Sequence, residues 1–233
     1  MADFTDPSSE TAKAVVEVAK TTGKAIDASR EAGRFISRFI AGSLEQGVGI
    51  FEDRLRYMRW ERQLRLMKRS EEVLHELGFE GPTRPVPMKI AIPLLQTASM
   101  EEDDSLQDRW INLLVNAANE KSGVEVNRAY IEILSQITPL EAQILDAIYF
   151  LPFAEVQHRG VITSDLPDNV YVAPRNQSEW QEPAYEVALA LANLARIQTL
   201  KPTMVMSGAE LYSRVIPTIM GSAFVSACRV RKP

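Results

Sequence analysis

The chain has few of the residues from which most catalytic and metal centres are built. Its 233 residues include one cysteine, Cys228, and two histidines, His75 and His158, which lie far apart in the sequence. An intrachain disulfide is therefore excluded, and no spacing typical of a metal site is present. No elbow glycines or flanking motif supports a nucleophilic set made of Cys228 and the two histidines. We expect a protein without enzymatic activity, cofactor or metal ion.

A long uncharged apolar run is missing as well. Arg34, Arg38, Glu45 and Glu52 interrupt the most apolar stretch, which leaves it short of the roughly 18 residues that a membrane-spanning helix needs. The first ten residues are acidic and polar, unlike a secretory signal. We expect a cytoplasmic protein, with peripheral attachment to the inner membrane as an open alternative.

Charge is distributed unevenly along the chain. The formal net charge is −5, but residues 30–69 contain ten Lys/Arg against five Asp/Glu, so the remainder carries −10. Such polarity can direct one face toward an anionic surface or toward the acidic half of another copy. The overall negative sign disfavours a general nucleic-acid-binding role.

Periodicity and turn residues divide the chain into four parts. Residues 1–10 form a polar tail that we expect to be disordered, and residues 11–78 carry the helical periodicity of an N-terminal arm. Glycines and prolines concentrate at the linker, residues 79–87. Residues 88–233 form a helical core that ends in a winged-helix-like subdomain. The predicted fold class is therefore mainly α, with short β-hairpins.

Several short helices are predicted within the core. Apolar positions recur at helical spacing after residue 104 and again over 128–136. Thr138, Pro139 and Glu141 then form a capping box with proline at the first helical position, which predicts a helix over 139–151. The acidic run 101–104 is the only carboxylate cluster. It lacks the spacing of a calcium loop, so we expect it to cap the helix that follows.

The C-terminal third predicts two hairpins and two helices. Helical periodicity disappears over 153–181, where segments 161–163 and 170–172 are candidate strands. A helix is predicted over 183–195, with Tyr185, Ala188, Leu189, Ala192 and Ala195 on one face, followed by a hairpin over 197–216 and a closing helix over 218–228. This order is typical of a winged helix. The helix before the wing has few basic or amide side chains, so we expect a packing role and no direct base readout.

Several of these segments resemble one protein family. Ile92 to Ser99, Leu106 to Trp110 and Ile131 to Leu134, followed by Leu140, Glu141 and Ala142, are similar to the abortive-infection alpha family of bacterial proteins. The resemblance extends over about 54–228. It implies a role in defence against phage, and it implies no catalytic residue, because the shared positions are mostly apolar helix positions.

The arm carries a candidate anion-binding surface. A phosphate, lipid headgroup or nucleic acid would be bound by a set of arginines before the linker: Arg56, Arg59, Arg62, Arg65 and Arg69. The competing interpretation is a solvated helix face that is partly balanced by neighbouring glutamates.

The arm also carries a candidate apolar face. Its large side chains alternate with Arg34 and Arg38, as in a helix that lies in a membrane interface. Packing within an oligomer is the competing interpretation, and the shortness of the uncharged stretch favours it. The face consists of Phe35, Ile36, Phe39, Ile40 and Leu44.

These patterns together favour a non-enzymatic phage-defence protein of the abortive-infection type. We expect it to act through protein–protein assembly or through membrane perturbation by its N-terminal helices. The expected partners are further copies of the chain or another protein, with a phage component and a membrane surface as further candidates. A nucleic-acid-binding winged-helix regulator is the alternative.

Overall fold

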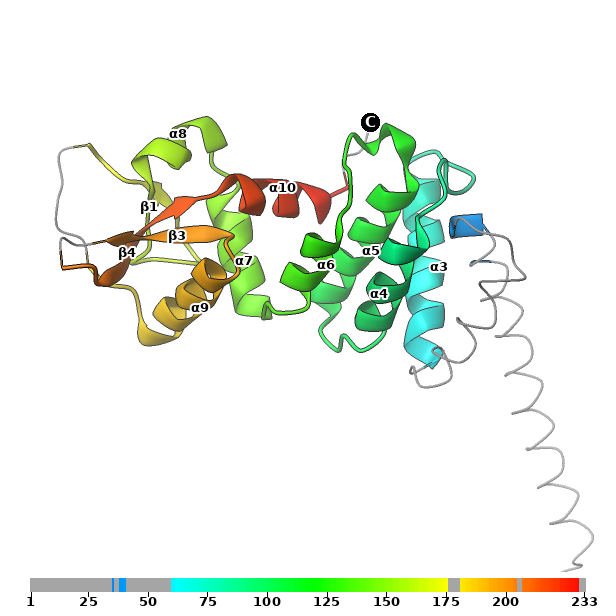
Figure 1. Ribbon diagram of the computed structural model, residues 1–233, viewed down its shortest axis with the longest axis horizontal. Coiled ribbons are helices and arrows are strands. Elements are labelled where there is room, and N and C mark those ends of the chain that lie inside the picture. Colours follow the sequence, from blue (N-terminus) through cyan, green and yellow to red (C-terminus); the bar gives the residue numbers. More distant parts are fainter. Residues whose placement is uncertain (1–34, 36–37, 41–59, 176–180, 205–206, 231–233) are drawn as a thin grey trace, which may run out of the picture.

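The computed structural model describes residues 35, 38–40, 60–175, 181–204 and 207–230, with side chains from Arg65 onward in the first long helix. These residues are mostly helical and form two lobes (Figure 1). The helical lobe contains four helices and a 3-10 turn: α3 (Trp60–Glu76), α4 (Met88–Ala98), α5 (Asp104–Ala118), η1 (Glu120–Ser122) and α6 (Arg128–Leu134). Residues 1–34, 36–37 and 41–59, which include the predicted tail over 1–10 and the predicted start of the arm, lie outside the described residues.

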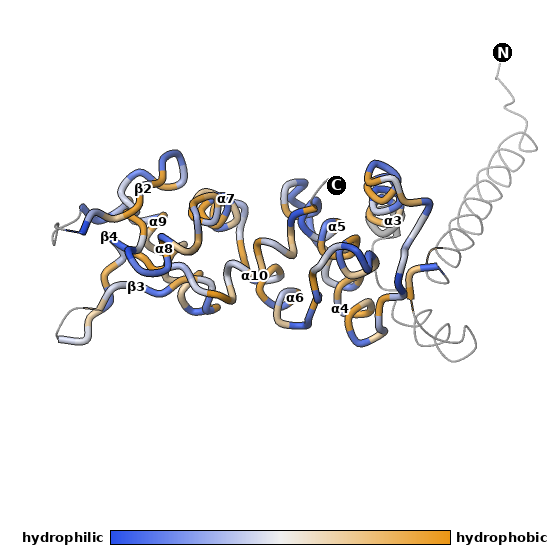
Figure 2. The backbone as a smooth tube through the Cα atoms, turned by 90° about the horizontal axis from the view of Figure 1, so that it is seen from above, coloured by the Kyte–Doolittle hydropathy of each residue, from blue (hydrophilic) through white to orange (hydrophobic). Residues whose placement is uncertain are grey.

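The sheet lobe follows along the chain. Its helices are α7 (Pro139–Ile148), α8 (Phe153–Arg159) and α9 (Tyr185–Arg196), and its strands are β1 (Val161–Ile162), β2 (Tyr171–Val172), β3 (Leu200–Met204) and β4 (Glu210–Pro217). The last helix, α10 (Ile219–Ala227), runs from the sheet lobe back to the helical lobe. Figure 2 shows the same elongated arrangement from above.

The helix α5 forms the centre of the helical lobe. Nine of its fifteen residues are buried, and Trp110 is fully enclosed. A helix that is apolar on most of its circumference must be covered on most sides. α5 accordingly contacts α3, α4, α6, α7 and α10. Because α3 packs on α5, the C-terminal part of the predicted arm shares the hydrophobic core of the residues that follow the linker.

The predicted helix starts are confirmed by their hydrogen bonds. The side chain of Thr138 accepts a bond from the Glu141 amide while the Glu141 side chain accepts one from the Thr138 amide, which completes the capping box. Asp103, from the acidic run, accepts bonds from the amides of Ser105 and Leu106 at the start of α5. The hydrogen bonds from Ser105 and Leu106 hold the pKa of Asp103 below its ordinary value.

The four strands form one antiparallel sheet in the order β2-β1-β4-β3. Both predicted hairpins are present, as the pairs β1–β2 and β3–β4. They are joined because Val161 of β1 pairs with Val172 of β2 and also with Val215 of β4. This central pairing was not predicted. The shape of the lobe therefore depends on a contact between segments more than fifty residues apart.

One prediction about the sheet lobe was wrong. The segment after Pro152 forms the helix α8, whereas no helix was expected; only Val156 of its seven residues is buried, which leaves no periodicity to detect. The helix α9 is present as predicted, but the apolar face noted in its sequence is not the face that packs on the core. Tyr185 and Leu189 are 81% and 60% exposed, and the buried residues are Val187, Ala190, Leu191 and Leu194. An alanine- and leucine-rich helix is apolar on both faces, so periodicity alone could not choose between them.

Candidate functional site

One part of the predicted apolar face packs against the helical lobe beside the linker. Phe39 is fully buried and Phe35 is 3% exposed, and their rings stack with centroids 3.9 Å apart. The Val86 amide donates a 2.6 Å hydrogen bond to the Phe39 carbonyl, and Ile40 and Val86 form an isolated parallel β-bridge. We call this contact, made by Phe35, Arg38, Phe39 and Val86, the arm dock.

Arg38 adds a polar side to the arm dock. Its guanidinium donates to the carboxylate of Glu71 at 2.9 Å and to the carbonyl of Glu80 at 2.8 Å. A Cβ at position 81 would overlap this guanidinium, so Gly81 provides the space for it. The side chains of Arg38 and Glu71 are almost half exposed, and such pairs contribute at most about 1 kcal/mol. Burial of the two phenylalanines therefore supplies most of the stabilisation of the dock.

The other residues of the predicted apolar face are placed differently. Ile40 is half-buried against the same core, while Ile36 and Leu44 lie outside the described residues. The described part of the face thus contacts its own chain. Contact of this face with a membrane or with another copy stays a prediction, and it would require the arm dock to open.

The predicted basic surface is only partly described. Arg56 and Arg59 lie outside the described residues, and Arg62 belongs to α3 without a described side chain. Arg69 is bound by the carboxylates of Glu72 at 3.2 Å and Glu76 at 3.3 Å, and its hydrogen bond to Glu72 raises its pKa. Two of its own neighbours therefore compete with any external anion.

Arg65 is more accessible than Arg69. Its nearest carboxylate among the described side chains is Asp104, whose oxygen lies 3.8 Å from the guanidinium, and both side chains are largely exposed. An exposed pair at this distance is weak. Arg65 is therefore the described member of the basic set that is best placed to bind an anion.

A charged network joins the two lobes. Asp146 of α7 accepts hydrogen bonds from Arg109 of α5 and, at 2.8 Å, from Arg229 beyond α10. Burial by itself raises the pKa of Asp146, but the hydrogen bonds and charges of the two arginines outweigh burial and hold that pKa below its ordinary value. The carboxylate is thus ionised and fully engaged in holding the lobes together.

The polar groups of α9 are occupied inside the protein. Asn193 donates to the carbonyl of Gln136 and to the carboxylate of Glu141, and its own side-chain oxygen accepts from Arg196. Arg196 also binds the side-chain oxygen of Gln136. These are the side chains that would read base edges if α9 were a recognition helix. Its exposed surface instead presents Tyr185 and Leu189.

The cysteine and the two histidines, which are the remaining candidates for a reactive site, lie in places that do not form one. Cys228 is buried, and burial raises the pKa of its thiol to about 12, so a nucleophilic thiolate is disfavoured. His75 and His158 lie in the last turns of α3 and α8. In the part of the chain that the structure describes, no three His, Cys, Asp or Glu residues gather as they would around a metal ion. None of the described helices combines the length and apolarity needed to cross a bilayer.

Sequence reasoning did not identify the network around Asp146. Arg109 lies within the segments that resemble the abortive-infection family, but nothing in their spacing links it to a residue 37 positions later in the chain. A pair of coupled substitutions in related chains would have been the usable signal.

Comparison with known proteins gives one match. No curated protein and no solved structure matches the chain. A family model described as abortive infection alpha matches residues 61–228, which is more than half of the 233 residues and includes every element from α4 to α10. The chain therefore belongs to the abortive infection alpha family.

Proposed function

We propose that the protein defends bacteria against phage by abortive infection, without an enzymatic activity of its own, and that its N-terminal helices provide the effector or assembly surface. The family membership supports the defence role. The engagement of Asp146, Glu141 and Cys228 in structural contacts supports a non-enzymatic mechanism, because each of these groups is already bound or buried.

The arm dock is the observation that carries the mechanistic part of the proposal. It is a site on the helical lobe that receives two aromatic side chains, one backbone hydrogen bond and one arginine from the arm. A site that binds these groups from the same chain can bind them from a second copy, which is a low-cost route to oligomers. Opening and exchange of the dock would thus convert a monomer into an assembly.

Membrane perturbation is the second form of the same mechanism. Phe35 and Phe39 would provide the apolar face that inserts between lipid headgroups. Because both are buried in the described conformation, insertion would first have to break the dock. Assembly requires only an exchange of like contacts, and it is therefore the form that we favour.

A role in nucleic-acid recognition has little support. The winged-helix-like order of α9, β3, β4 and α10 is compatible with such a role, but Asn193 and Arg196 are bound within the protein. The formal net charge of −5 points the same way, since nucleic-acid binding depends on phosphate neutralisation by basic residues.

The defence role is tested by infection. Bacteria that express the protein are infected with a panel of phages at a ratio that infects every cell, and culture density and phage yield are followed. We expect the culture to collapse while phage yield falls relative to cells with an empty vector. Equal phage yields across the whole panel would contradict the proposal.

The role of the arm dock is tested by charge exchange at its polar side. Arg38→Glu should weaken the dock and change the apparent mass of the purified protein in light scattering, as should Glu71→Arg. The double variant restores an opposite pair and should return both the mass distribution and the reduction in phage yield toward wild type. If neither the single charge variants nor Phe39→Ala changes mass or phage yield, the dock is not the assembly surface.

A second experiment, with lipid vesicles, separates the two forms of the mechanism. Vesicles of phosphatidylethanolamine and phosphatidylglycerol are loaded with a fluorescent dye and mixed with wild-type protein or with Phe39→Asp. Leakage with wild type alone would assign the effect to membrane insertion. Intact vesicles, together with Arg38-dependent oligomers, would assign it to assembly.

A further inference from the structure

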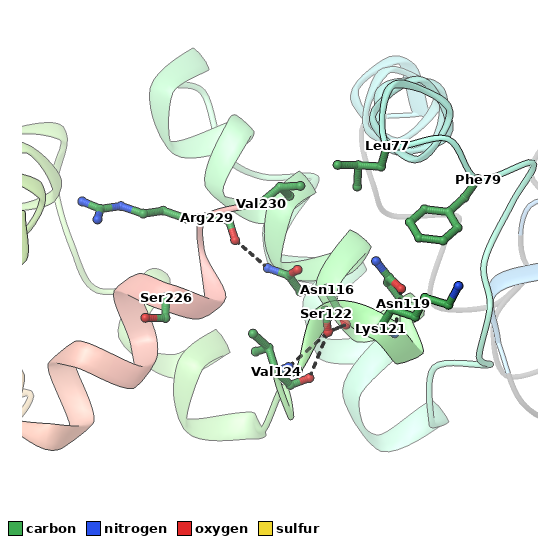
Figure 3. A pocket seen from close by; sticks show the side chains of 11 residues that line it. Leu77, Phe79, Asn116, Asn119, Lys121, Ser122, Val124, Ser226, Arg229 and Val230 are labelled. Atoms are coloured by element: carbon green, nitrogen blue, oxygen red, sulfur yellow. Dashed lines mark hydrogen bonds between the residues drawn. The ribbon is translucent and has the colours of Figure 1, made fainter. Parts of the chain in front are cut away.

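A pocket lies where the end of α3, the junction of α5 with η1, and the end of α10 meet. Its volume is about 470 Å³, which is within the range of small-molecule sites. Figure 3 shows Leu77 and Phe79 on one side of it and Asn116, Asn119 and Ser122 on the other. The pocket is separate from the arm dock and from the basic surface of α3, since none of their named residues lines it.

Two nearly buried amide side chains supply its polar wall. Asn116 is 4% exposed and uses its Nδ2 to bind the carbonyls of Ala227 and Arg229. Asn119 is 6% exposed, and its Oδ1 accepts from the Lys121 amide at 2.9 Å. Among the described residues, the Oδ1 of Asn116 and the Nδ2 of Asn119 have no hydrogen-bond partner. The wall thus offers one acceptor and one donor.

The cationic side of the pocket is provided by Lys121. Two basic residues line the pocket, but Arg229 directs its guanidinium to Asp146, away from Asn119 (Figure 3). Lys121 has no carboxylate within ion-pair distance in the described part of the chain, and its side chain is exposed. It is therefore available to bind an anionic group at the mouth of the pocket.

The remaining wall is apolar. The space next to the amides is lined by four apolar side chains: Leu77, Phe79, Val124 and Val230. Among them, Phe79 contributes an aromatic ring. Paired amide donors and acceptors recognise the edges of nucleobases, aromatic rings stack on their faces, and lysine binds phosphate as a point charge. This combination fits a planar heteroaromatic ring that carries one anionic group.

We propose that this pocket binds a small nucleotide of the nucleoside monophosphate class. The base lies between Phe79 and the amides of Asn116 and Asn119, and the phosphate pairs with Lys121. The site does not depend on the proposed defence role. Its position gives binding a structural consequence, because its walls come from the arm side of the helical lobe and from α10, which leads to the sheet lobe.

Binding is measured by isothermal titration calorimetry on the full-length protein. The probes are AMP, GMP, CMP and UMP, with inorganic phosphate and adenosine as partial ligands. We expect at least one nucleotide to bind more tightly than both partial ligands. If no nucleotide binds, or if inorganic phosphate binds as tightly as the best nucleotide, the proposal is overturned.

The decisive variant is Asn119→Asp. An aspartate keeps the oxygen that accepts from the Lys121 amide but replaces the pocket-facing donor with a negative oxygen. Nucleotide affinity should fall by about tenfold or more, since a hydrogen bond is lost and charge repulsion is added. The matched control is Asn127→Asp, which makes the same exchange at the N-cap of α6, outside this pocket.

A second pair of variants tests the phosphate contact. Lys121→Ala should weaken nucleotide binding and reduce its dependence on salt, whereas Lys201→Ala removes an exposed lysine from β3 and should change neither. Circular dichroism and thermal unfolding verify that each variant is folded. Equal losses in Lys121→Ala and Lys201→Ala, or unchanged affinity in both Asn119→Asp and Lys121→Ala, would place the binding site elsewhere.

Discussion

Truncation of Phe39 to alanine gives the most direct test of how the N-terminal arm is held. Its side chain is fully buried, with 0% exposure, and its ring stacks on that of Phe35. Replacement of a buried phenylalanine by alanine typically costs about 3–5 kcal/mol. If the segment that contains Phe35 and Phe39 detached without unfolding of the rest of the protein, the measured loss would be limited to the free energy of docking. We expect about 3 kcal/mol if the dock is an integral part of the cooperative fold.

Two measurements separate local detachment from global destabilisation. Urea unfolding reports the free energy of the whole fold, while hydrogen exchange of the Val86 amide reports the dock, because this amide donates to the Phe39 carbonyl. In Phe39→Ala we expect faster exchange at Val86 together with a lower urea midpoint. A lower midpoint with unchanged Val86 exchange would mean that the stability loss arises elsewhere.

Phe150→Ala is the matched control. This phenylalanine is 83% exposed, so its truncation should change the free energy of unfolding by no more than about 0.5 kcal/mol and should leave Val86 exchange unaltered. Equal effects of the two substitutions would refute the reasoning, because burial would then not determine which aromatic side chain stabilises the chain.

Three further outcomes are expected. Tyr149→Phe should lower the free energy of unfolding by about 1–3 kcal/mol, because it removes the hydrogen bonds of the hydroxyl to the carbonyls of Thr199 and Thr218. Burial raises the pKa of Tyr149 to about 12, above its ordinary value near 10. The wild type should therefore lose stability as pH rises from 10 toward 12, and the variant should lose less. Asp146→Asn should destabilise by roughly 1–3 kcal/mol at neutral pH by leaving Arg109 and Arg229 without their carboxylate. Since the pKa of Asp146 is lowered in the fold, its contribution is present above the ordinary value near 3.8 and disappears as pH falls through the folded value, which acid-unfolding curves of both proteins can verify. Cys228 should resist alkylation in the native protein and react only in urea, because burial raises its pKa to about 12.

Local signals in the sequence predicted local structure well. The capping box at Thr138 and Glu141 located the start of α7, and the acidic run before α5 indicated the cap that Asp103 provides. These features depend on residues two or three positions apart, which are neighbours along the chain as well as in space. The two hairpins were found for the same reason, since turn residues lie between their strands.

Contacts between distant segments could not be predicted from the sequence. The joining of the hairpins through Val161 and Val215 and the engagement of Asp146 by Arg229 depend on how the elements pack. The apolar face at Phe35 and Phe39 was recognised, but periodicity cannot distinguish burial within the chain from burial against a partner or a membrane. The pocket residues Asn116 and Asn119 gave no signal, because asparagine near a helix end is more often a cap than a ligand.

The return of α10 to the helical lobe changes how the molecule can be divided. Phe224 of α10 is fully buried and lies beside Tyr130 of α6, with ring centroids 6.3 Å apart. Topologically, the sheet lobe is thus an insertion into the helical lobe, because α10 returns from the last strand to contact α5 and α6 (Figure 1). A fragment that ends after α6 would expose the surface of α5 and α6 on which α10 packs, so truncation cannot isolate either lobe cleanly. A fluorescent label at position 230 would accordingly report on the helical lobe, because Val230 shares a pocket with Leu77 and Asn116, although the strand before α10, β4, belongs to the sheet lobe.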